Sequence, residues 1–186
     1  VRTGKKLWTF HTIPRKGEFG YDTWLEGSAD YTGNTGIWGP FSTDDELGYA
    51  YLNIEASTND FYGGHRQGAN LFSNSLVCID IKTGKRIWHQ QLVHHDIWDY
   101  DMPPAPILLD VTVDGKPVKA VVQMTKQAIA YAFDRTNGTP LFGWTEMRVP
   151  QTTVPKEWTA KTQPIPNKPP PFDLHGITHN DLIDFT

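Results

Sequence analysis

One short pattern occurs three times in this chain, and it constrains the fold more than any other feature. The copies occupy residues 2–8, 80–88 and 134–142, and in each a glycine is followed four residues later by Trp8, Trp88 or Phe142. In the second and third copies an aspartate lies four residues before the glycine, and an apolar run precedes it. Glycine adopts positive φ without strain, so each copy predicts a β-hairpin turn.

A repeated hairpin that carries an aromatic residue predicts a β-propeller, in which the aromatic packs over a turn and pins one unit to the next. Gly4 and Gly84 are 80 residues apart, whereas Gly84 and Gly138 are 54 apart. The longer interval leaves two possibilities open: an extra blade without the motif, or an insertion within one blade.

Composition supports an all-β fold. Among 186 residues, 12% are aromatic, 16 are Gly and 14 are Pro, which favours strands broken by many turns. We expect strands at 49–54, 106–113 and 119–124, and only a short helical turn, beginning at 42–46. Residues 150–175 contain seven prolines and predict an extended surface segment.

Charge and cysteine content exclude several classes of protein. The net charge is −4 and the basic residues are scattered, which argues against a nucleic-acid partner. No apolar run approaches the ~18 residues that span a bilayer. The single cysteine, Cys78, lies in an apolar run and is expected to be a buried hydrophobic residue.

The segment from His94 to Asp101 concentrates groups with chemical potential. It holds three carboxylates, two imidazoles and two large aromatic side chains within eight residues. Asp99 and Asp101 are two residues apart and would share one face of an extended strand. Two such carboxylates repel each other unless a cation or a proton lies between them. The pattern predicts a hard-metal site, or a catalytic base beside a metal ligand.

The Asp-x-x-Thr-Gly-x-x-x-Trp repeat resembles the tryptophan-docking motif of the eight-bladed quinoprotein dehydrogenases, which use pyrroloquinoline quinone (PQQ). The His-His-Asp-x-Trp-Asp-x-Asp segment is similar to the active-site segment of that family, in its membrane-bound glucose dehydrogenase branch. The resemblance implies that residues 1–186 are a fragment, about three blades of one PQQ-binding propeller domain.

The resemblance also implies roles for individual residues. Asp99 falls on the general base, and Lys126 falls on the basic residue that bonds the quinone oxygens. Trp38 matches the aromatic floor on which PQQ stacks, and Thr58 matches a threonine near the cofactor. Asp99 and Asp101 would ligate a metal ion, either Ca²⁺ or a Mg²⁺ or lanthanide ion in its place.

One departure from the family pattern concerns the metal. The family has Gly-Asn, with Asn as a ligand, where this chain has Glu55-Ala56. The Ala56 side chain cannot ligate. Glu55 would replace the ligand only if a bulge turned it to the other face, because adjacent strand residues point in opposite directions.

The implied activity is oxidation of a sugar or alcohol hydroxyl by hydride transfer to metal-bound PQQ. Electrons would pass to ubiquinone or cytochrome c, in the periplasm or at the periplasmic face of a bacterial inner membrane. Two alternatives remain: a non-catalytic scaffold with PQQ-like repeats, and an inactive paralogue, which Ala56 suggests. A partial ring leaves open sheet edges, so residues 1–186 alone are expected to be inactive and to aggregate or fold poorly.

Overall fold

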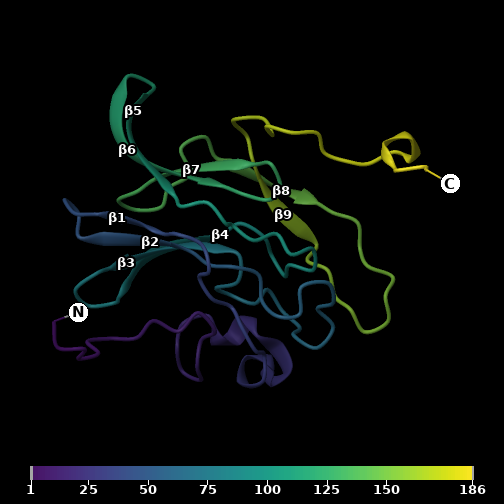
Figure 1. The fold of residues 1–186 in the computed structure, drawn as a ribbon, viewed down its shortest axis with the longest axis horizontal. Coiled ribbons are helices and arrows are strands. Elements are labelled where there is room, and N and C mark those ends of the chain that lie inside the picture. The colour runs from purple at the N-terminus through teal and green to yellow at the C-terminus, as the bar shows by residue number, and fades with distance from the viewer. Residues whose placement is uncertain (1, 186) are drawn as a thin grey trace.

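Regular structure in this computed structural model, which describes residues 2–185, is almost entirely antiparallel β-sheet (Figure 1). The first sheet has the order β1 (Ser42–Asp44), β2 (Tyr49–Asn53), β3 (Ser75–Asp80), β4 (Arg86–Gln91). The second contains β5 (Ile107–Val113), β6 (Lys116–Met124) and β7 (Ala130–Asp134), and the third contains β8 (Trp144–Arg148) and β9 (Thr162–Pro166). Three short 3₁₀ helices complete the described chain: η1 (Tyr21–Thr23), η2 (Leu25–Asp30) and η3 (His179–Asp181). The all-β prediction is confirmed.

The first sheet is buried on both faces, which explains its apolar strands. Tyr51, Leu76 and Cys78 point to one face and pack with residues of β7, in a core between the first two sheets. Ala50 and Val77 alternate with them and point to the other face, which the N-terminal segment covers. Figure 1 shows this layering, with the N-terminal segment in purple on one side of β1–β4 and β5–β7 on the other. Cys78 is fully buried, and burial raises the pKa of its thiol to about 12.

The repeated aromatics dock as the pattern predicts. Trp8 Nε1 donates a hydrogen bond to Ile81 O at 2.9 Å, and its indole lies against Gly84 of the second copy. Trp88 Nε1 donates to a carbonyl at 3.1 Å, and its indole lies against Gly138 of the third copy. Both glycines have positive φ, 68° and 78°, and a Cβ at either would clash with the indole. Each tryptophan therefore locks its own unit to the next.

A buried ion pair also joins the first two sheets. Arg135, just after β7, donates from Nε to Asp44 Oδ2 of β1 at 2.7 Å and from Nη1 to Asp110 at 2.8 Å. Burial alone would raise the pKa of Asp44. The Leu47 amide and the Arg135 guanidinium outweigh that effect, so the pKa is lowered.

Two local predictions need correction. The segment at 42–46 divides in two: Ser42–Asp44 forms β1, because its backbone pairs with β2, and the predicted short turn begins only at Asp44, whose carbonyl accepts the Gly48 N–H at 2.8 Å. The proline-rich segment 150–175 is extended where β9 pairs with β8, but it does not lie wholly on the surface, since Thr159, Ala160 and Gln163 are buried. Its prolines are tolerated because β9 lies at the edge of a two-stranded sheet. The chain beyond it extends away from the sheets (Figure 1).

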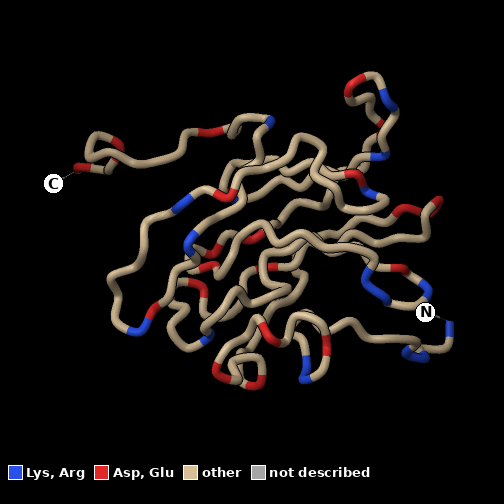
Figure 2. The backbone as a smooth tube through the Cα atoms, turned by 180° about the vertical axis from the view of Figure 1, so that it is seen from behind, with Lys and Arg blue, Asp and Glu red and all other residues tan. Residues whose placement is uncertain are grey.

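Charged residues lie mainly in turns and loops, with both signs interspersed (Figure 2). The absence of a nucleic-acid partner stays a prediction. Within residues 2–185, no helix has the length and apolar character that a membrane span requires.

Candidate active site

The acidic segment lies in the irregular loop 92–106, between β4 and β5, and not in a strand. The argument from strand alternation for Asp99 and Asp101 was therefore wrong. Asp99 has left-handed backbone geometry, with φ of 60°, as does His95, with φ of 48°. The two carboxylates nevertheless converge, because both reach Lys126, which follows β6 in the second sheet.

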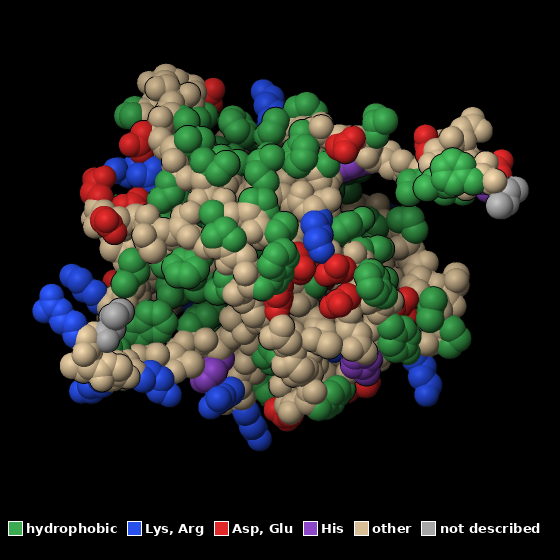
Figure 3. Space-filling view, viewed as in Figure 1, with side chains coloured by type: hydrophobic (Ala, Val, Ile, Leu, Met, Phe, Trp, Pro, Cys, Tyr) green, Lys and Arg blue, Asp and Glu red, His purple; other side chains and the backbone are tan. Residues whose placement is uncertain are grey.

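Lys126 holds the two carboxylates together. Its Nζ donates to Asp99 Oδ2 and to Asp99 O, both at 2.9 Å, and lies 3.4 Å from Asp101 Oδ2. Burial by itself lowers the pKa of Lys126, but the hydrogen bond to Asp99 and the charges of both aspartates reverse the effect and raise it. Acidic side chains gather around basic atoms near the middle of the face in Figure 3. One ammonium beside two carboxylates leaves a formal charge of −1, which favours a further cation.

Asp101 is the most enclosed member of this group, with 8% of its surface exposed. Its Oδ1 accepts the backbone N–H of Ala56 at 2.8 Å, and its Oδ2 accepts Trp38 Nε1 at 3.2 Å. Trp38 itself is 61% exposed, so its ring remains available for stacking. We call Trp38, Asp99, Asp101 and Lys126 the acid–lysine cluster. Its direct contacts join residues that are 25 to 63 positions apart in the sequence.

Glu55 and Thr58 lie outside this cluster. Glu55 Oε1 accepts the Gly36 N–H at 2.6 Å and a hydrogen bond from the Asn34 amide. Burial, together with the charge of Asp101, raises the pKa of Glu55. Thr58 Oγ1 accepts the Asn34 N–H at 3.2 Å. Both side chains therefore hold the segment 34–36 and do not meet the Asp99 carboxylate.

The two histidines of the loop have structural partners. His95 is fully buried, and its Nδ1 donates to Gly68 O at 2.7 Å. Burial and the nearby Arg66 lower the pKa of His95 to about 4, so its ring is neutral at pH 7. His94 lies 3.2 Å from Glu146 Oε1 of β8. Both histidines therefore support the loop, and neither ring lines the cavity described next.

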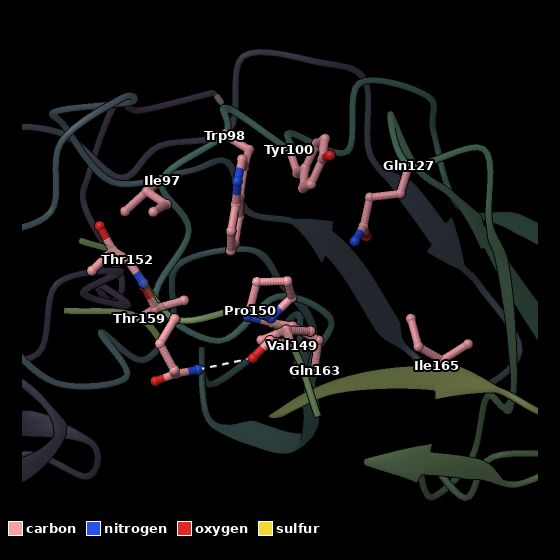
Figure 4. A pocket seen from close by; sticks show the side chains of 11 residues that line it. Ile97, Trp98, Tyr100, Gln127, Val149, Pro150, Thr152, Thr159, Gln163 and Ile165 are labelled. Atoms are coloured by element: carbon pink, nitrogen blue, oxygen red, sulfur yellow. Dashed lines mark hydrogen bonds between the residues drawn. The ribbon is translucent and has the colours of Figure 1, made fainter. Parts of the chain in front are cut away.

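A cavity of about 430 Å³ flanks the loop (Figure 4). Its lining residues are Ile97, Trp98, Tyr100, Gln127, Val149, Pro150, Gln151, Thr152, Thr159, Gln163 and Ile165. The rings of Trp98 and Tyr100, which flank Asp99 in sequence, stack at 5.7 Å. The Gln127 amide points into the cavity in Figure 4, and among residues 2–185 its shielded Oε1 has no hydrogen-bond donor. None of these lining side chains is charged.

A family model, described as the β-propeller domain of PQQ glucose/ethanol/alcohol dehydrogenases, matches residues 1–186. The chain belongs to this family. This chain is 36% identical to quinoprotein glucose dehydrogenase A of Acinetobacter calcoaceticus, over 99% of this chain and 23% of that protein. It is 32% identical to a quinate/shikimate dehydrogenase (quinone) of Acinetobacter baylyi, over 98% of this chain and 22% of that protein.

Solved structures support the same conclusion. A quinohemoprotein alcohol dehydrogenase of Pseudomonas putida HK5 superposes with a TM-score of 0.62 at 29% identity, over 78% of this chain and 22% of that one. The corresponding enzyme of Comamonas testosteroni gives 0.60 at 27% identity, over 78% and 22%. The quinoprotein propeller thus spans less than a quarter of the length of these relatives, and its fold is part of a β-propeller.

The cluster has the chemistry that the family's cofactor and metal ion need. A planar, anionic quinone needs an apolar floor and a cation, and the exposed Trp38 ring and Lys126 provide both in one place. Hard cations prefer oxygen donors, which Asp99 and Asp101 supply. Within residues 2–185, however, no group of three or more His, Cys, Asp or Glu side chains is arranged to hold a metal ion. Glu55 is not brought to the pair, so other ligands would have to complete a metal site.

The sequence did not reveal two groups that hold the loop 92–106 in place. The backbone N–H of Ala56 donates a hydrogen bond to Asp101, whereas the sequence showed only that the Ala56 side chain cannot ligate a metal. The carboxylate of Asp96 accepts two amides of the loop, and it had been assigned no role. A backbone donor has no sequence signal, whereas an aspartate two residues before an aromatic is a recognisable turn signal.

Proposed function

We propose that this chain carries the catalytic base and part of the cofactor site of a quinoprotein dehydrogenase that oxidises a sugar or alcohol hydroxyl. The observation that carries the proposal is the acid–lysine cluster, in which three distant segments place a carboxylate, an ammonium and an exposed indole side by side. A propeller kept only as a scaffold has no need of this combination.

When bound, PQQ supplies the two-electron acceptor, and a Ca²⁺, Mg²⁺ or lanthanide ion supplies Lewis acidity. In the proposed reaction Asp99 takes the proton of the substrate hydroxyl through a carboxylate oxygen. Lys126 keeps that oxygen oriented and balances its charge. Trp38 forms the floor for the ring system, and Asp101 anchors Trp38 and shares Lys126 with the base. Asp99 and Asp101 are the proposed metal ligands of this chain. Thr58 remains a proposed neighbour of the cofactor.

The cavity beside the loop suits a neutral substrate. Its stacked aromatic wall can cover the apolar face of a ring or an alkyl chain. A carboxylated substrate would find no cationic partner among the described lining residues. Neutral sugars and alcohols are therefore the proposed substrate class.

Electrons are proposed to leave to ubiquinone or cytochrome c. The proposed location of the protein is the periplasm or the periplasmic face of the inner membrane. That residues 1–186 alone are inactive and fold poorly stays a prediction, and exposed apolar side chains such as Leu7 (77%) and Ile107 (46%) favour it.

The test is dye-linked dehydrogenase activity of the full-length protein that contains this chain, reconstituted with PQQ and either Ca²⁺ or La³⁺. Glucose and simple alcohols should be oxidised, and quinate should not. Asp99→Asn should lower kcat by about 10²–10⁴-fold, the usual contribution of a general base, without changing the melting temperature.

The inactive-paralogue alternative rests on Ala56, which offers only its backbone to the cluster. It predicts a folded full-length protein that neither binds PQQ nor turns over with either metal. That result would also leave the scaffold interpretation standing and would remove the proposed base role of Asp99.

A further inference from the structure

Asp96 occupies the centre of the loop that carries the proposed base. Its side chain is fully buried. Oδ1 accepts the Trp98 N–H at 2.9 Å, and Oδ2 accepts the Tyr100 N–H at 2.7 Å. These two amides belong to the residues on either side of Asp99. The carboxylate therefore clamps the backbone immediately before and after the base.

A second residue, in the segment that precedes β3, holds the same part of the loop. Asn74, directly before β3, donates from Nδ2 to Asp96 Oδ2 at 2.9 Å and to Tyr100 O at 3.0 Å. Asn74 itself has a positive φ of 46°. The loop is thereby fastened to the first sheet at the Asp96 carboxylate and at the carbonyl of Tyr100.

A layer below, Arg66 supports the loop backbone. Its side chain is fully buried and donates to the main-chain oxygens of Asn59 and Asp96 and, at 2.9 Å, to Asn70 Oδ1. The pKa of the Asp96 carboxyl is raised by burial, although the Trp98 and Tyr100 amides, Asn74 and Arg66 oppose the rise. Burying a carboxylate costs free energy unless hydrogen bonds compensate it, and those of Asp96 go to the backbone around Asp99.

Asp99 needs this support because its backbone is held in a sparsely populated region. A non-glycine residue with φ of 60° persists only where its surroundings fix it. The amides on both sides of it are fixed by one carboxylate, and its carbonyl and side chain are both fixed by Lys126. The left-handed turn points the carboxylate at Lys126.

We infer that Asp96 is the positioning residue of the base: together with Asn74 it holds Asp99 in its left-handed conformation, so that the Asp99 carboxylate meets Lys126 and the substrate hydroxyl. The part about the substrate rests on the function proposed above. The part about the backbone does not, since it concerns the conformation of the loop in the free protein.

The test uses Asp96→Asn in the full-length protein, because its amide can accept one of the two N–H groups but not both. Asn74→Gly is a second variant, since glycine keeps the positive φ and removes only the amide. Asp134→Asn is the matched control: Asp134 Oδ1 also accepts a turn amide, from Thr136 at 2.8 Å, but in a docking turn. Steady-state kinetics and hydrogen exchange of the peptide 94–101 are measured for each.

We expect Asp96→Asn and Asn74→Gly to lower kcat by about 10–100-fold with KM changed less than about twofold, as for a misplaced base. Exchange should accelerate by about tenfold or more in peptide 94–101 alone, and the control should match the wild type in both measurements. Unchanged kcat and exchange in both variants would overturn the inference. So would accelerated exchange throughout the protein with normal kcat.

An inactive wild-type protein would refute the proposed function and not this inference. In that case the exchange of peptide 94–101 decides alone. Local acceleration in the two variants would support the clamp on Asp99, and exchange equal to the wild type would overturn it.

Discussion

The turns at 80–84 and 134–138, on which Trp8 and Trp88 dock, and the acid-rich loop 92–106 are each held by an aspartate that accepts backbone N–H groups. They differ in how far along the chain the supporting contacts reach. In the second docking turn Asp80 Oδ1 accepts the N–H of Thr83 at 2.7 Å and its hydroxyl at 2.8 Å, all within three residues. In the loop Asp96 likewise accepts amides two and four residues ahead. The loop then depends on Asn74, 22 residues away, and on Lys126, 27 residues from Asp99.

This difference separates stability from chemistry. The docking turns are short, locally specified and repeated, and their aromatic residues bury large areas between units. Within the loop, segment 94–101 adds no side chain to the hydrophobic core, whereas Leu92, Val93 and Met102 are buried core residues. That acid-rich segment is fixed by polar contacts to two sheets. We therefore expect changes in the docking turns to affect unfolding, and changes in the loop to affect turnover.

The largest expected effect on stability comes from Trp88→Ala. Trp88 is 6% exposed and packs between Tyr51 and Phe133, so its removal should cost about 3–5 kcal/mol of unfolding free energy, measured by urea unfolding. Turnover of the variant, measured well below its midpoint, should stay within about twofold of the wild type. Phe142→Ala, at a 40% exposed position, should cost distinctly less. A large loss of kcat in Trp88→Ala would contradict the separation.

Lys126→Met probes the opposite region. It leaves two carboxylates together without their cation, and we expect kcat to fall by about 10²-fold, comparable to the loss of one stabilising donor. Lys116→Met, at the exposed first position of β6, serves as the control and should keep kcat. Wild-type kinetics in Lys126→Met would remove Lys126 from the proposed chemistry.

The same variant gives a pH test. The hydrogen bond to Asp99 and the charges of both aspartates raise the pKa of Lys126 in the folded protein above its ordinary value of 10.5. Any stability from its charge is therefore fully present below about pH 10.5 and is lost as pH rises through the folded pKa. The difference in urea midpoint between wild type and Lys126→Met should be constant from pH 7 to 9 and narrow above pH 10.5. A difference that widens with pH would contradict this sign.

Two glycines allow the docking contact to be measured by itself. Gly115 has φ of 76° with open space around it, and Gly138 has φ of 78° with the Trp88 ring against it. Gly115→Ala should cost about 1–2 kcal/mol for the left-handed backbone alone. Gly138→Ala should cost more, because the indole must also shift. Equal costs in thermal or urea unfolding would show that the indole does not press on the turn.

The smallest effect is expected at an exposed ion pair. Lys119 Nζ lies 2.5 Å from Glu46 Oε2, and the Glu46 side chain is 70% exposed. Glu46→Ala should change unfolding free energy by less than about 1 kcal/mol, and the remaining effect should shrink in 1 M salt. A cost as large as that of Gly138→Ala would mean that this pair fastens the sheets, as Asp44 and Arg135 do.

Local pattern was enough for the strands and turns. Apolar runs and turn residues located β2 and β5 closely and most of β6, and the spacing of Gly and Trp predicted the docking. The edge strands were not predicted. β1 covers the first residues of the predicted helical turn at 42–46, and β9 lies within the proline-rich segment 150–175. Their pairing depends on a neighbouring strand more than on their own residues.

The sequence by itself determined that this chain forms antiparallel hairpins joined by docked tryptophans, because those features follow from residues within nine positions of one another. It also singled out the carboxylates and the lysine for which we propose a chemical role. Only the tertiary structure decided how they meet. Packing of the first two sheets brings Lys126 to Asp99, the Ala56 amide reaches Asp101, and Asp96 holds the loop between them. Contacts between distant segments depend on how strands stack, and that order is not written in any single stretch of the chain.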